Sequence, residues 1–346
     1  MSTQWIAFAL RYFFLIGEQL KFKRYKNNPI LKPEDFGKWD VGAVFNCGAT
    51  VTEDGNVVML YRAVPSGYRK ADSGKGYINY VSSIGCAVSR DGYSFSIDEK
   101  AVITPQEEWD RYGCEDPRIT RFTDKGKETY LLTYTALSSP AFSGKGDRVA
   151  LAATEDFKTY IRRGVIIPGI KDKDAVFFPE RINGKIALLH RIPPDIQIVY
   201  FEDMEEVGKA DGNFWSQYSE SKEDHTILKR KYKWESKKIG AGPPPVKTEE
   251  GWLLIYHGVD KDNVYRAGVV LLDLEDPSRV IARSSLPILE PEEDYEKIGD
   301  VNNVVFPEGA VVLDDTLFVY YGAADKVCAL ATAKVHDILD FLKGFR

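Results

Sequence analysis

One pattern recurs five times along the chain and limits the folds that are open to it. Each copy consists of a loop, a short strand, a polar turn and an apolar strand that ends in or near Tyr or His. The copies occupy residues 41–64, 113–137, 174–192, 238–259 and 301–325. A second hairpin follows most copies, and after the first copy it carries an Asp91-Gly92 turn, which is typical of tight hairpins. Four-stranded units that recur at roughly 60 residues indicate propeller blades, although the commonest blade repeats are shorter. The sequence therefore predicts an all-β fold, a five-bladed β-propeller.

The propeller is predicted to fill residues 28–346, after an N-terminal extension of residues 1–27. Within this extension, residues 5–16 are almost wholly apolar apart from Arg11. This run is too short to span a bilayer, and it lacks the basic start and small-residue cleavage site of a signal peptide. We therefore expect a short N-terminal helical extension that packs on the propeller or on a neighbouring subunit, and a homo-oligomer remains open.

Composition excludes several classes of partner. The net charge is −6 and the sequence contains no basic stripe, which argues against nucleic acid as a partner. The four cysteines and four histidines show neither a disulfide framework nor a metal-ligand spacing. We expect reduced thiols in a cytoplasmic protein with no metal, no cofactor and no membrane partner. An aromatic insert at residues 211–235 either covers the central pocket or anchors a long surface loop.

The stretch GCEDPRIT, residues 113–120, carries two adjacent acids, Glu115 and Asp116. Pro117 disfavours helical backbone in the residue before it, so an extended Asp116 is expected. A strand-like run follows, which places the acids on a loop that enters a hairpin. Loops that open each repeat of a propeller converge on its axis. We therefore expect one shared site for this acidic loop, Asn46, Asp174, residues 178–180 and Glu308. An acidic turn that merely begins a strand is the alternative interpretation.

Seven motifs together point to one family. They are GCEDPRIT, KDKDAVFFPE, LLHR, KIGAGPPP, GWLLIYHGV, LLDLEDPSRVIAR and VYYGAAD. In this order they resemble glycoside hydrolase family 130, whose members are mainly inverting β-mannoside phosphorylases on a five-bladed propeller. The resemblance extends over residues 28–335 and is strongest to the branch that acts on manno-oligosaccharides. The stretch HRIPPDI, residues 190–196, resembles members that act on β-1,2-mannosides.

The resemblance implies a division of the site into an acidic half and a cationic half. Asp116 matches the catalytic acid, whose proton reaches the glycosidic oxygen through the 3-hydroxyl of the bound mannose. Its neighbour Glu115 is expected to bind the sugar and to raise the pKa of Asp116 by like-charge repulsion. The other residues assigned to mannoside binding are Asn46, Arg62, Arg118, Asp174 and Asp325. Phosphate needs no general base, so a cationic pocket suffices as the second half. The residues assigned to it are Arg148, Lys173, Arg191 and His257.

The predicted activity is that of a glycosyltransferase-class phosphorylase. It converts β-1,2- or β-1,4-linked manno-oligosaccharide and inorganic phosphate, its co-substrate, into α-D-mannose 1-phosphate and a shortened saccharide. Three alternatives remain open at this point: an inverting β-mannosidase on the same propeller, a non-catalytic mannoside-binding propeller and a sugar-nucleotide transferase. The last lacks support, because the sequence carries neither a Gly-rich diphosphate loop nor a D-x-D metal site in a nucleotide-binding context.

Overall fold

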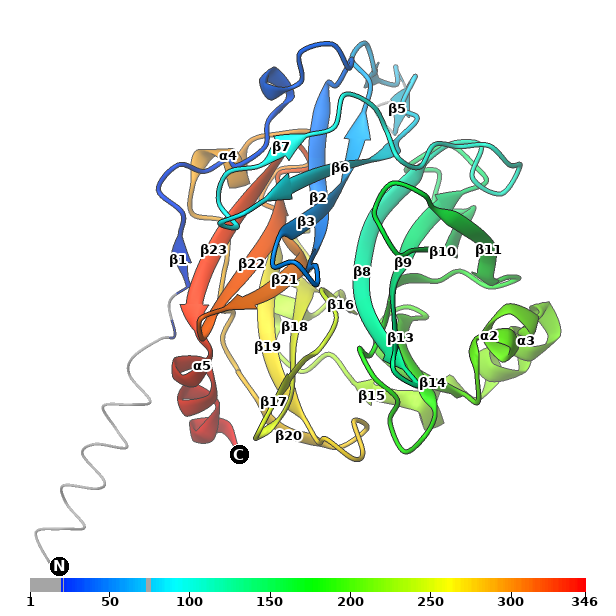
Figure 1. Cartoon of the computed structure of the whole chain (residues 1–346), viewed down its shortest axis with the longest axis vertical. Coiled ribbons are helices and arrows are strands. Elements are labelled where there is room, and N and C mark those ends of the chain that lie inside the picture. The colour runs from blue at the N-terminus through cyan, green and yellow to red at the C-terminus, as the bar shows by residue number, and fades with distance from the viewer. Residues whose placement is uncertain (1–19, 21, 73–75) are drawn as a thin grey trace, which may run out of the picture.

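The computed structural model describes residues 20, 22–72 and 76–346. Five β-sheets are arranged around a central axis (Figure 1), which confirms the predicted five-bladed propeller. The first strands of most neighbouring blades contact one another around that axis. Each blade begins close to the start of one sequence repeat, because one repeat supplies the innermost strands of one sheet.

Counted outward from the axis, blade 1 contains β2 (Ala43–Val51), β3 (Val57–Val64), β6 (Ser83–Ser89) and β7 (Ser96–Ile97). Blade 2 contains β8 (Cys114–Asp124), β9 (Lys127–Leu137), β10 (Asp147–Thr154) and β11 (Ile161–Ile167). Blade 3 contains β12 (Lys173–Phe177), β13 (Ile186–Arg191), β14 (Ile196–Phe201) and β15 (Thr226–Leu228). Blade 4 contains β16 (Lys238–Ala241), β18 (Gly251–Val259), β19 (Tyr265–Leu272) and β20 (Val280–Arg283), and β17 (Val246–Thr248) also pairs with β18. Blade 5 contains β21 (Val305–Leu313), β22 (Thr316–Ala323), β23 (Val327–Lys334) and β1 (Lys23–Arg24).

Short elements connect or cover these sheets. A small hairpin of β4 (Arg69–Lys70) and β5 (Tyr77–Ile78) rises between β3 and β6. The helices are α2 (Met204–Lys209), α3 (Gly212–Glu220), α4 (Asp294–Lys297) and α5 (Val335–Leu342). The 3-10 turns are η1 (Pro33–Asp35), η2 (Lys222–His225), η3 (Lys233–Glu235) and η4 (Lys343–Phe345). None of the helices in the described part of the chain has the length and apolar character that crossing a membrane requires.

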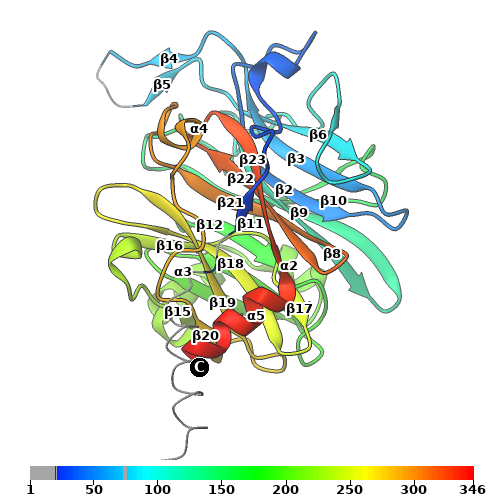
Figure 2. The same cartoon turned by 90° about the vertical axis from the view of Figure 1, so that its left-hand side faces the viewer.

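The fifth blade departs from the pattern of two hairpins per repeat. Its own repeat supplies β21, β22 and β23, after which the chain continues into α5, which lies in front of blades 4 and 5 in Figure 2. The fourth strand, β1, comes from the start of the chain, where Lys23 pairs with Thr332 and Arg24 with Ala331. Pairing with β1 covers the edge of β23, which would otherwise expose unpaired backbone groups.

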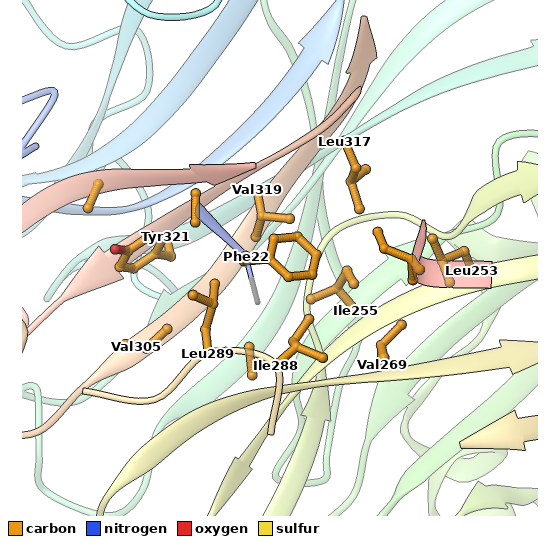
Figure 3. Packing of buried hydrophobic residues seen from close by; sticks show 14 of the residues in the cluster. Phe22, Leu253, Ile255, Val269, Ile288, Leu289, Val305, Leu317, Val319 and Tyr321 are labelled. Carbon is orange, nitrogen blue, oxygen red and sulfur yellow. The ribbon is translucent and has the colours of Figure 1, made fainter. Parts of the chain in front are cut away.

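The end of the predicted N-terminal extension therefore belongs to the propeller. Most of the segment for which a helix is predicted, residues 1–19 together with residue 21, lies outside the described residues. Phe22 is 4% exposed, and its ring lies among Ile255, Ile288 and Val319 (Figure 3). This side chain fills the core between blades 4 and 5 next to the strand that completes the ring.

Apolar residues fill the spaces between neighbouring blades. In β18, Leu253 and Ile255 join the cluster shared with blade 5, while Leu254 and Tyr256 join the cluster shared with blade 3. Successive side chains of a strand point to opposite faces, so a strand between two blades buries both of its faces. This is why GWLLIYHGV reads as a continuous apolar run.

The aromatic insert of blade 3 anchors helices and does not cover the pocket. Trp215 and Tyr218 of α3 are buried in the cluster between blades 2 and 3. The indole Nε1 of Trp215 donates a hydrogen bond of 2.9 Å to the carbonyl of Ile166. Of the two interpretations of this insert, the anchoring one is therefore correct.

Candidate active site

A cavity of about 400 Å³ lies where the innermost strands of the blades meet, and all five blades contribute to its lining. It brings together most of the residues that the sequence assigned to the site. These are Asn46, Arg62, Glu115, Asp116, Lys173, Asp174, Arg191, His257 and Asp325. A pocket of this size lined by converging polar groups is typical of a small-molecule site.

Bulges in the innermost strands direct polar side chains at the axis. Asn46, Asp116 and Asp174 have positive φ angles of 51°, 54° and 58°, and each lies at a register shift in β2, β8 or β12. A bulge redirects one side chain out of the normal alternation, and Asn and Asp tolerate left-handed backbone better than bulkier residues. The expectation of an extended Asp116 on a loop is therefore wrong. The acids lie within strand β8, and its pairing with β9 overrides the preference that Pro117 imposes.

Asp116 is 6% exposed and is held through one of its two carboxylate oxygens. Asn46 Nδ2 donates to Oδ1 at 2.8 Å, and Arg62 Nη1 lies 3.2 Å from the same atom. Within the described residues, Oδ2 forms no hydrogen bond to a protein group. Asp116 therefore presents one free carboxylate oxygen at the cavity.

The pKa of Asp116 is shifted downward, which contradicts the expected increase. Burial alone would raise it, but the positive charges of Arg62 and Lys173 and the hydrogen bond from Asn46 outweigh that effect. The carboxylate form thus predominates when the cavity holds no ligand. The prediction failed because it considered the neighbouring acid in sequence and not the cations that folding brings to the same carboxylate.

Glu115 has the opposite shift. Burial raises its pKa, against the opposing charges of Arg62 and Lys173. Its Oε1 accepts from Arg62 Nη2 and from Ser82 Oγ at 3.2 Å, while its Oε2 lies 3.9 Å from Lys173 Nζ. Both oxygens of Glu115 are thus engaged, whereas Asp116 keeps one oxygen free.

Arg118 lies behind the acids and not in the cavity lining. Its Nη2 forms ion pairs with Asp174 Oδ1 at 3.1 Å and with Glu308 Oε1 at 3.0 Å. Its Nη1 donates to the backbone carbonyl of Asp116 at 3.2 Å, and its Nε donates to that of Gly242 at 3.0 Å. The side chain is 1% exposed, and it ties the innermost strands of several blades together.

The cationic wall of the cavity consists of Lys173, Arg191 and Lys238, with His257 beside them. Arg191 Nε lies 3.0 Å from Asp174 Oδ2, yet in the described part of the chain Nε and Nη1 have no hydrogen-bond acceptor in suitable geometry. Burial lowers the pKa of His257 well below its usual range, against the opposing charge of Asp174. His257 is therefore neutral near pH 7, and its assignment to a set of cations needs correction. Lys173 keeps its charge, because the carboxylates of Asp147 and Glu115 outweigh the effect of burial and raise its pKa.

Lys238 lines the same wall and was missed by the sequence analysis. Burial, together with the positive charge of Arg191, lowers its pKa to about 7. Its Nζ lies 5.2 Å from the centre of the Tyr265 ring, and Tyr265 also lines the cavity. The available signal was its position: Lys238 opens the KIGAGPPP motif at the start of an innermost strand, as Lys173 does one blade earlier.

Arg148 is not among the residues of the cavity lining. Its Nη1 donates to the carbonyls of Asp147 at 2.8 Å and Ile170 at 3.3 Å. The residue before it does face the cavity, where Asp147 Oδ1 lies 3.8 Å from Lys173 Nζ. Arg148 therefore lies beside the cationic wall, and its predicted contact with phosphate is untested.

Two further members of the expected shared site lie elsewhere. Phe178 is buried in the core between blades 3 and 4, against Trp252. Glu180 forms an ion pair with Lys247 near the surface. Glu308 does reach the axis, but it is fully buried behind Arg118, and burial raises its pKa well above the usual range.

A buried hydrogen-bond chain supports the cationic wall from behind. Asp172 Oδ1 accepts from the backbone nitrogen of Arg191 at 3.2 Å, and its Oδ2 lies 2.7 Å from His190 Nδ1. His190 Nε2 lies 3.0 Å from the hydroxyl of Tyr218, which donates to the carbonyl of Ile198 at 2.8 Å. This chain connects β12 and β13 at the point where Lys173 pairs with Arg191. His190 is thus a core residue whose polar atoms are satisfied.

The donor set of the cavity does not suit a metal ion. Within the described residues, no group of three or more His, Cys, Asp and Glu side chains is placed to hold one. The carboxylates at the axis are instead paired with Arg62, Arg118, Lys173 and Arg191.

Comparison with known proteins places the chain in one family. The family described as beta-1,4-mannooligosaccharide phosphorylase, glycoside hydrolase family 130, matches residues 18–344. A 1,2-beta-oligomannan phosphorylase of Thermoanaerobacter sp. (strain X514) is 41% identical over 327 residues, which cover 92% of this chain and 99% of the relative.

Two solved structures have the same architecture. The beta-1,2-mannobiose phosphorylase from Listeria innocua, in complex with beta-1,2-mannobiose, superposes with a TM-score of 0.77 at 32% identity, over 93% of this chain and 99% of that one. The second is described with the statement that the family of mannoside phosphorylases contains glycoside hydrolases that target beta-1,2 mannosidic linkages in Candida mannan. It superposes with a TM-score of 0.73 at 25% identity, over 92% and 94% of the two chains. With a family match that extends over nearly the whole sequence, this chain belongs to glycoside hydrolase family 130.

Proposed function

We propose that this protein is an inverting phosphorylase of β-linked manno-oligosaccharides that releases α-D-mannose 1-phosphate. The observation that carries the proposal is the pairing of two unlike walls in one cavity. On one side Asp116 presents a free carboxylate oxygen, and on the other Arg191 lines the cavity while its buried Nε and Nη1 lack a hydrogen-bond acceptor in the described residues. An acid for the leaving oxygen and a binding place for a reactive anion are the two groups that phosphorolysis requires.

The proposed reaction breaks one bond to the anomeric carbon and forms another on the opposite face. Asp116 supplies a proton, through the 3-hydroxyl of the bound mannose, to the glycosidic oxygen as its bond to C1 breaks. A phosphate oxygen forms the new bond to C1 from the other side, so a β-linkage becomes an α-phosphate. Phosphate is already an anion and needs no base, whereas an inverting hydrolase needs a second carboxylate to activate water.

The low pKa of Asp116 in the free protein connects acid catalysis to phosphate binding. Arg62 and Lys173 are the cations that lower this pKa, and Lys173 belongs to the cationic wall that we assign to phosphate. A bound phosphate dianion offsets the charge of Lys173 and thereby raises the pKa of Asp116, because an anion nearby disfavours a second negative charge. In this proposal phosphate thus helps to keep the acid protonated in the complete complex.

Within the β-mannosides we favour the β-1,2 linkage. The relative that is 41% identical carries the name of a β-1,2-oligomannan phosphorylase, and the solved relative with a TM-score of 0.77 holds β-1,2-mannobiose. The name of the matching family keeps β-1,4-linked substrates as the second choice. We place the enzyme in the cytoplasm, a location supported by its four buried and unpaired cysteines.

The deciding experiment incubates the protein with β-1,2-mannobiose or β-1,4-mannobiose, each with and without inorganic phosphate. We expect formation of α-D-mannose 1-phosphate that depends on phosphate, with the β-1,2-linked substrate used more efficiently. Release of free mannose alone, at the same rate without phosphate, would instead assign the protein to the inverting mannosidases. Binding of the disaccharides without turnover would indicate a mannoside-binding propeller.

A further inference from the structure

Phe142 is an unusual residue at the mouth of the cavity. It lies in the loop between β9 and β10, lines the cavity and leaves 50% of its surface exposed. Its φ angle is +64°, in the left-handed region that bulky side chains rarely adopt. Strained backbone of this kind is typical of functional sites. Burial in the core does not account for it, because half of the residue faces solvent.

Neighbouring rings hold Phe142 in place. Its ring centre lies 5.3 Å from that of Tyr77 and 5.7 Å from that of Tyr80. Tyr77 is fixed in turn by a hydrogen bond of 2.9 Å from its hydroxyl to the carbonyl of Asp300. The loop is braced by the hydrogen bond from Ser143 N to the carbonyl of Pro140, at 3.1 Å. Phe142, from the loop between two strands of blade 2, is thus packed against two rings of the segment between β3 and β6 in blade 1.

A short series of contacts connects this surface to the acid. Asp116 is paired with Arg62, and Arg62 Nη2 donates to the hydroxyl of Tyr80 at 3.1 Å. Tyr80 is 4% exposed and contacts Phe142, which is 50% exposed. The series therefore leads from buried groups to a half-exposed ring. Asp116 and Phe142 line the same cavity, so a saccharide whose terminal sugar lies at Asp116 can extend toward Phe142.

We infer that Phe142 stacks on a sugar ring of the leaving saccharide and thereby sets the preference for oligosaccharide length. In a β-mannopyranoside the hydrogens of C1, C3 and C5 lie on one face of the ring. That face is apolar and carries partial positive charge, which suits the negative face of an aromatic ring. The inference rests on the proposed function and adds the element that binds the part of the substrate beyond the scissile bond.

The test compares Phe142→Ala, Phe142→Tyr and wild type in the phosphorolysis of β-1,2-mannobiose and β-1,2-mannotriose at saturating phosphate. Phe142→Ala is expected to raise KM for the trisaccharide by about threefold to tenfold, the range of a single aromatic contact. Phe142→Tyr keeps the ring and is expected to stay close to wild type. KM for phosphate is expected to remain unchanged in both variants. A substitution that merely destabilised the site would change KM for phosphate as well as KM for the saccharide.

A matched control is Phe214→Ala on α3, which removes a ring that is 38% exposed and is absent from the lining of the cavity. We expect this variant to keep the wild-type KM for both saccharides. Phosphorolysis by Phe142→Ala with wild-type KM values for both saccharides would overturn the inference and leave the proposed function intact. A wild-type protein that phosphorolyses no β-mannoside would overturn the proposed function and this inference with it.

Discussion

Arg24 and Glu296 are 272 residues apart in the sequence, and their side chains form a two-point ion pair. Arg24 Nε donates to Oε1 at 2.8 Å, and Nη2 donates to Oε2 at 3.0 Å. Glu296 is fully buried and also accepts from the hydroxyl of Tyr321 at 2.7 Å. The pair therefore ties β1, the strand that completes blade 5, to α4, which precedes the first strand of the same blade.

We expect Arg24→Ala to destabilise the propeller. The substitution leaves the buried carboxylate of Glu296 without its cation, and loss of one partner of a buried pair costs about 3 kcal/mol. Urea denaturation followed by tryptophan fluorescence measures the change. The matched control is Arg69→Ala, which breaks the exposed pair with Asp72 and is expected to change stability by less than about 1 kcal/mol. Equal stability of the two variants would contradict the role of Arg24.

Replacement of the proposed acid separates catalysis from binding. Asp116→Asn keeps the shape of the side chain but cannot donate a proton to the leaving oxygen, so kcat for phosphorolysis is expected to fall by about 10²–10⁴-fold. The affinity for β-1,2-mannobiose, measured by calorimetry, is expected to change little. Asp262→Asn serves as the control, because this carboxylate is exposed and absent from the cavity lining. A fully active Asp116→Asn variant would remove Asp116 from the mechanism.

Two arginines near the cationic wall are expected to differ in their effect on phosphate. Arg191 has unsatisfied donors at the cavity, so Arg191→Ala is expected to raise KM for phosphate by about tenfold or more. Arg148 already donates to two backbone carbonyls, and Arg148→Ala is expected to have a smaller effect. Initial rates at varied phosphate on one mannobiose give both values. An equal or larger effect of Arg148→Ala would place Arg148 in the phosphate site.

The support behind this wall is tested by Tyr218→Phe. The variant removes the hydroxyl that lies between His190 and the carbonyl of Ile198, so a loss of about 1 kcal/mol in stability is expected. Since His190 and Asp172 hold the pairing of Lys173 with Arg191, KM for phosphate is expected to rise while KM for mannobiose stays constant. If stability fell while KM for phosphate did not change, the hydrogen-bond chain through Tyr218 would have only a structural role.

Asp325 makes the stability of the protein depend on pH. Burial raises its pKa to about 7 against the opposing charge of Arg62, and the nearby Asp116 and Glu115 add to the increase. Between about pH 4 and pH 7 the folded protein keeps a proton that the unfolded chain has lost, so this carboxyl lowers stability as pH rises through that window. Asp325→Asn stays neutral, and its stability relative to wild type is expected to improve by about 1–3 kcal/mol from pH 4 to pH 7.

A control with the opposite sign is Asp91→Asn. Backbone hydrogen bonds from Ser94 and Tyr93 lower the pKa of Asp91, so its contribution is present above the pKa of the unfolded chain and is lost as pH falls. The stability deficit of Asp91→Asn is therefore expected to be larger at pH 7 than at pH 3. Thermal unfolding of both variants across this range, without ligand, measures the two trends, and parallel trends would contradict the assignment for Asp325.

The repeat was predictable because each blade has a strand, such as β18, that is buried on both faces over much of its length and carries a largely apolar run. Closure of the ring by Lys23 and Arg24 was not, because a two-residue strand has no periodicity of its own. In the site, the positive φ of Asp116 depends on its register with β9, which the local preference of Pro117 does not reveal. The charge state of His257 depends on burial between blades 4 and 5. The sequence assigned both Arg148 and Arg191 to phosphate binding, because both lie near the end of a strand segment. Only the folded strands show that Arg191 lines the cavity and Arg148 does not.

The pairing of β1 with β23 also relates closure of the propeller to the order in which its strands are synthesised. Lys23 and Arg24 are synthesised well before their partners Thr332 and Ala331, because the other strands of all five blades lie between them in the sequence. At roughly 5–20 residues per second, the interval between the two is on the order of tens of seconds. Blades 1 to 4 are completed one after another during that interval, and the core that receives Phe22 stays incomplete until blade 5 has been synthesised. The ring can therefore close only after β23 has been synthesised, because β1 has no partner strand before that point.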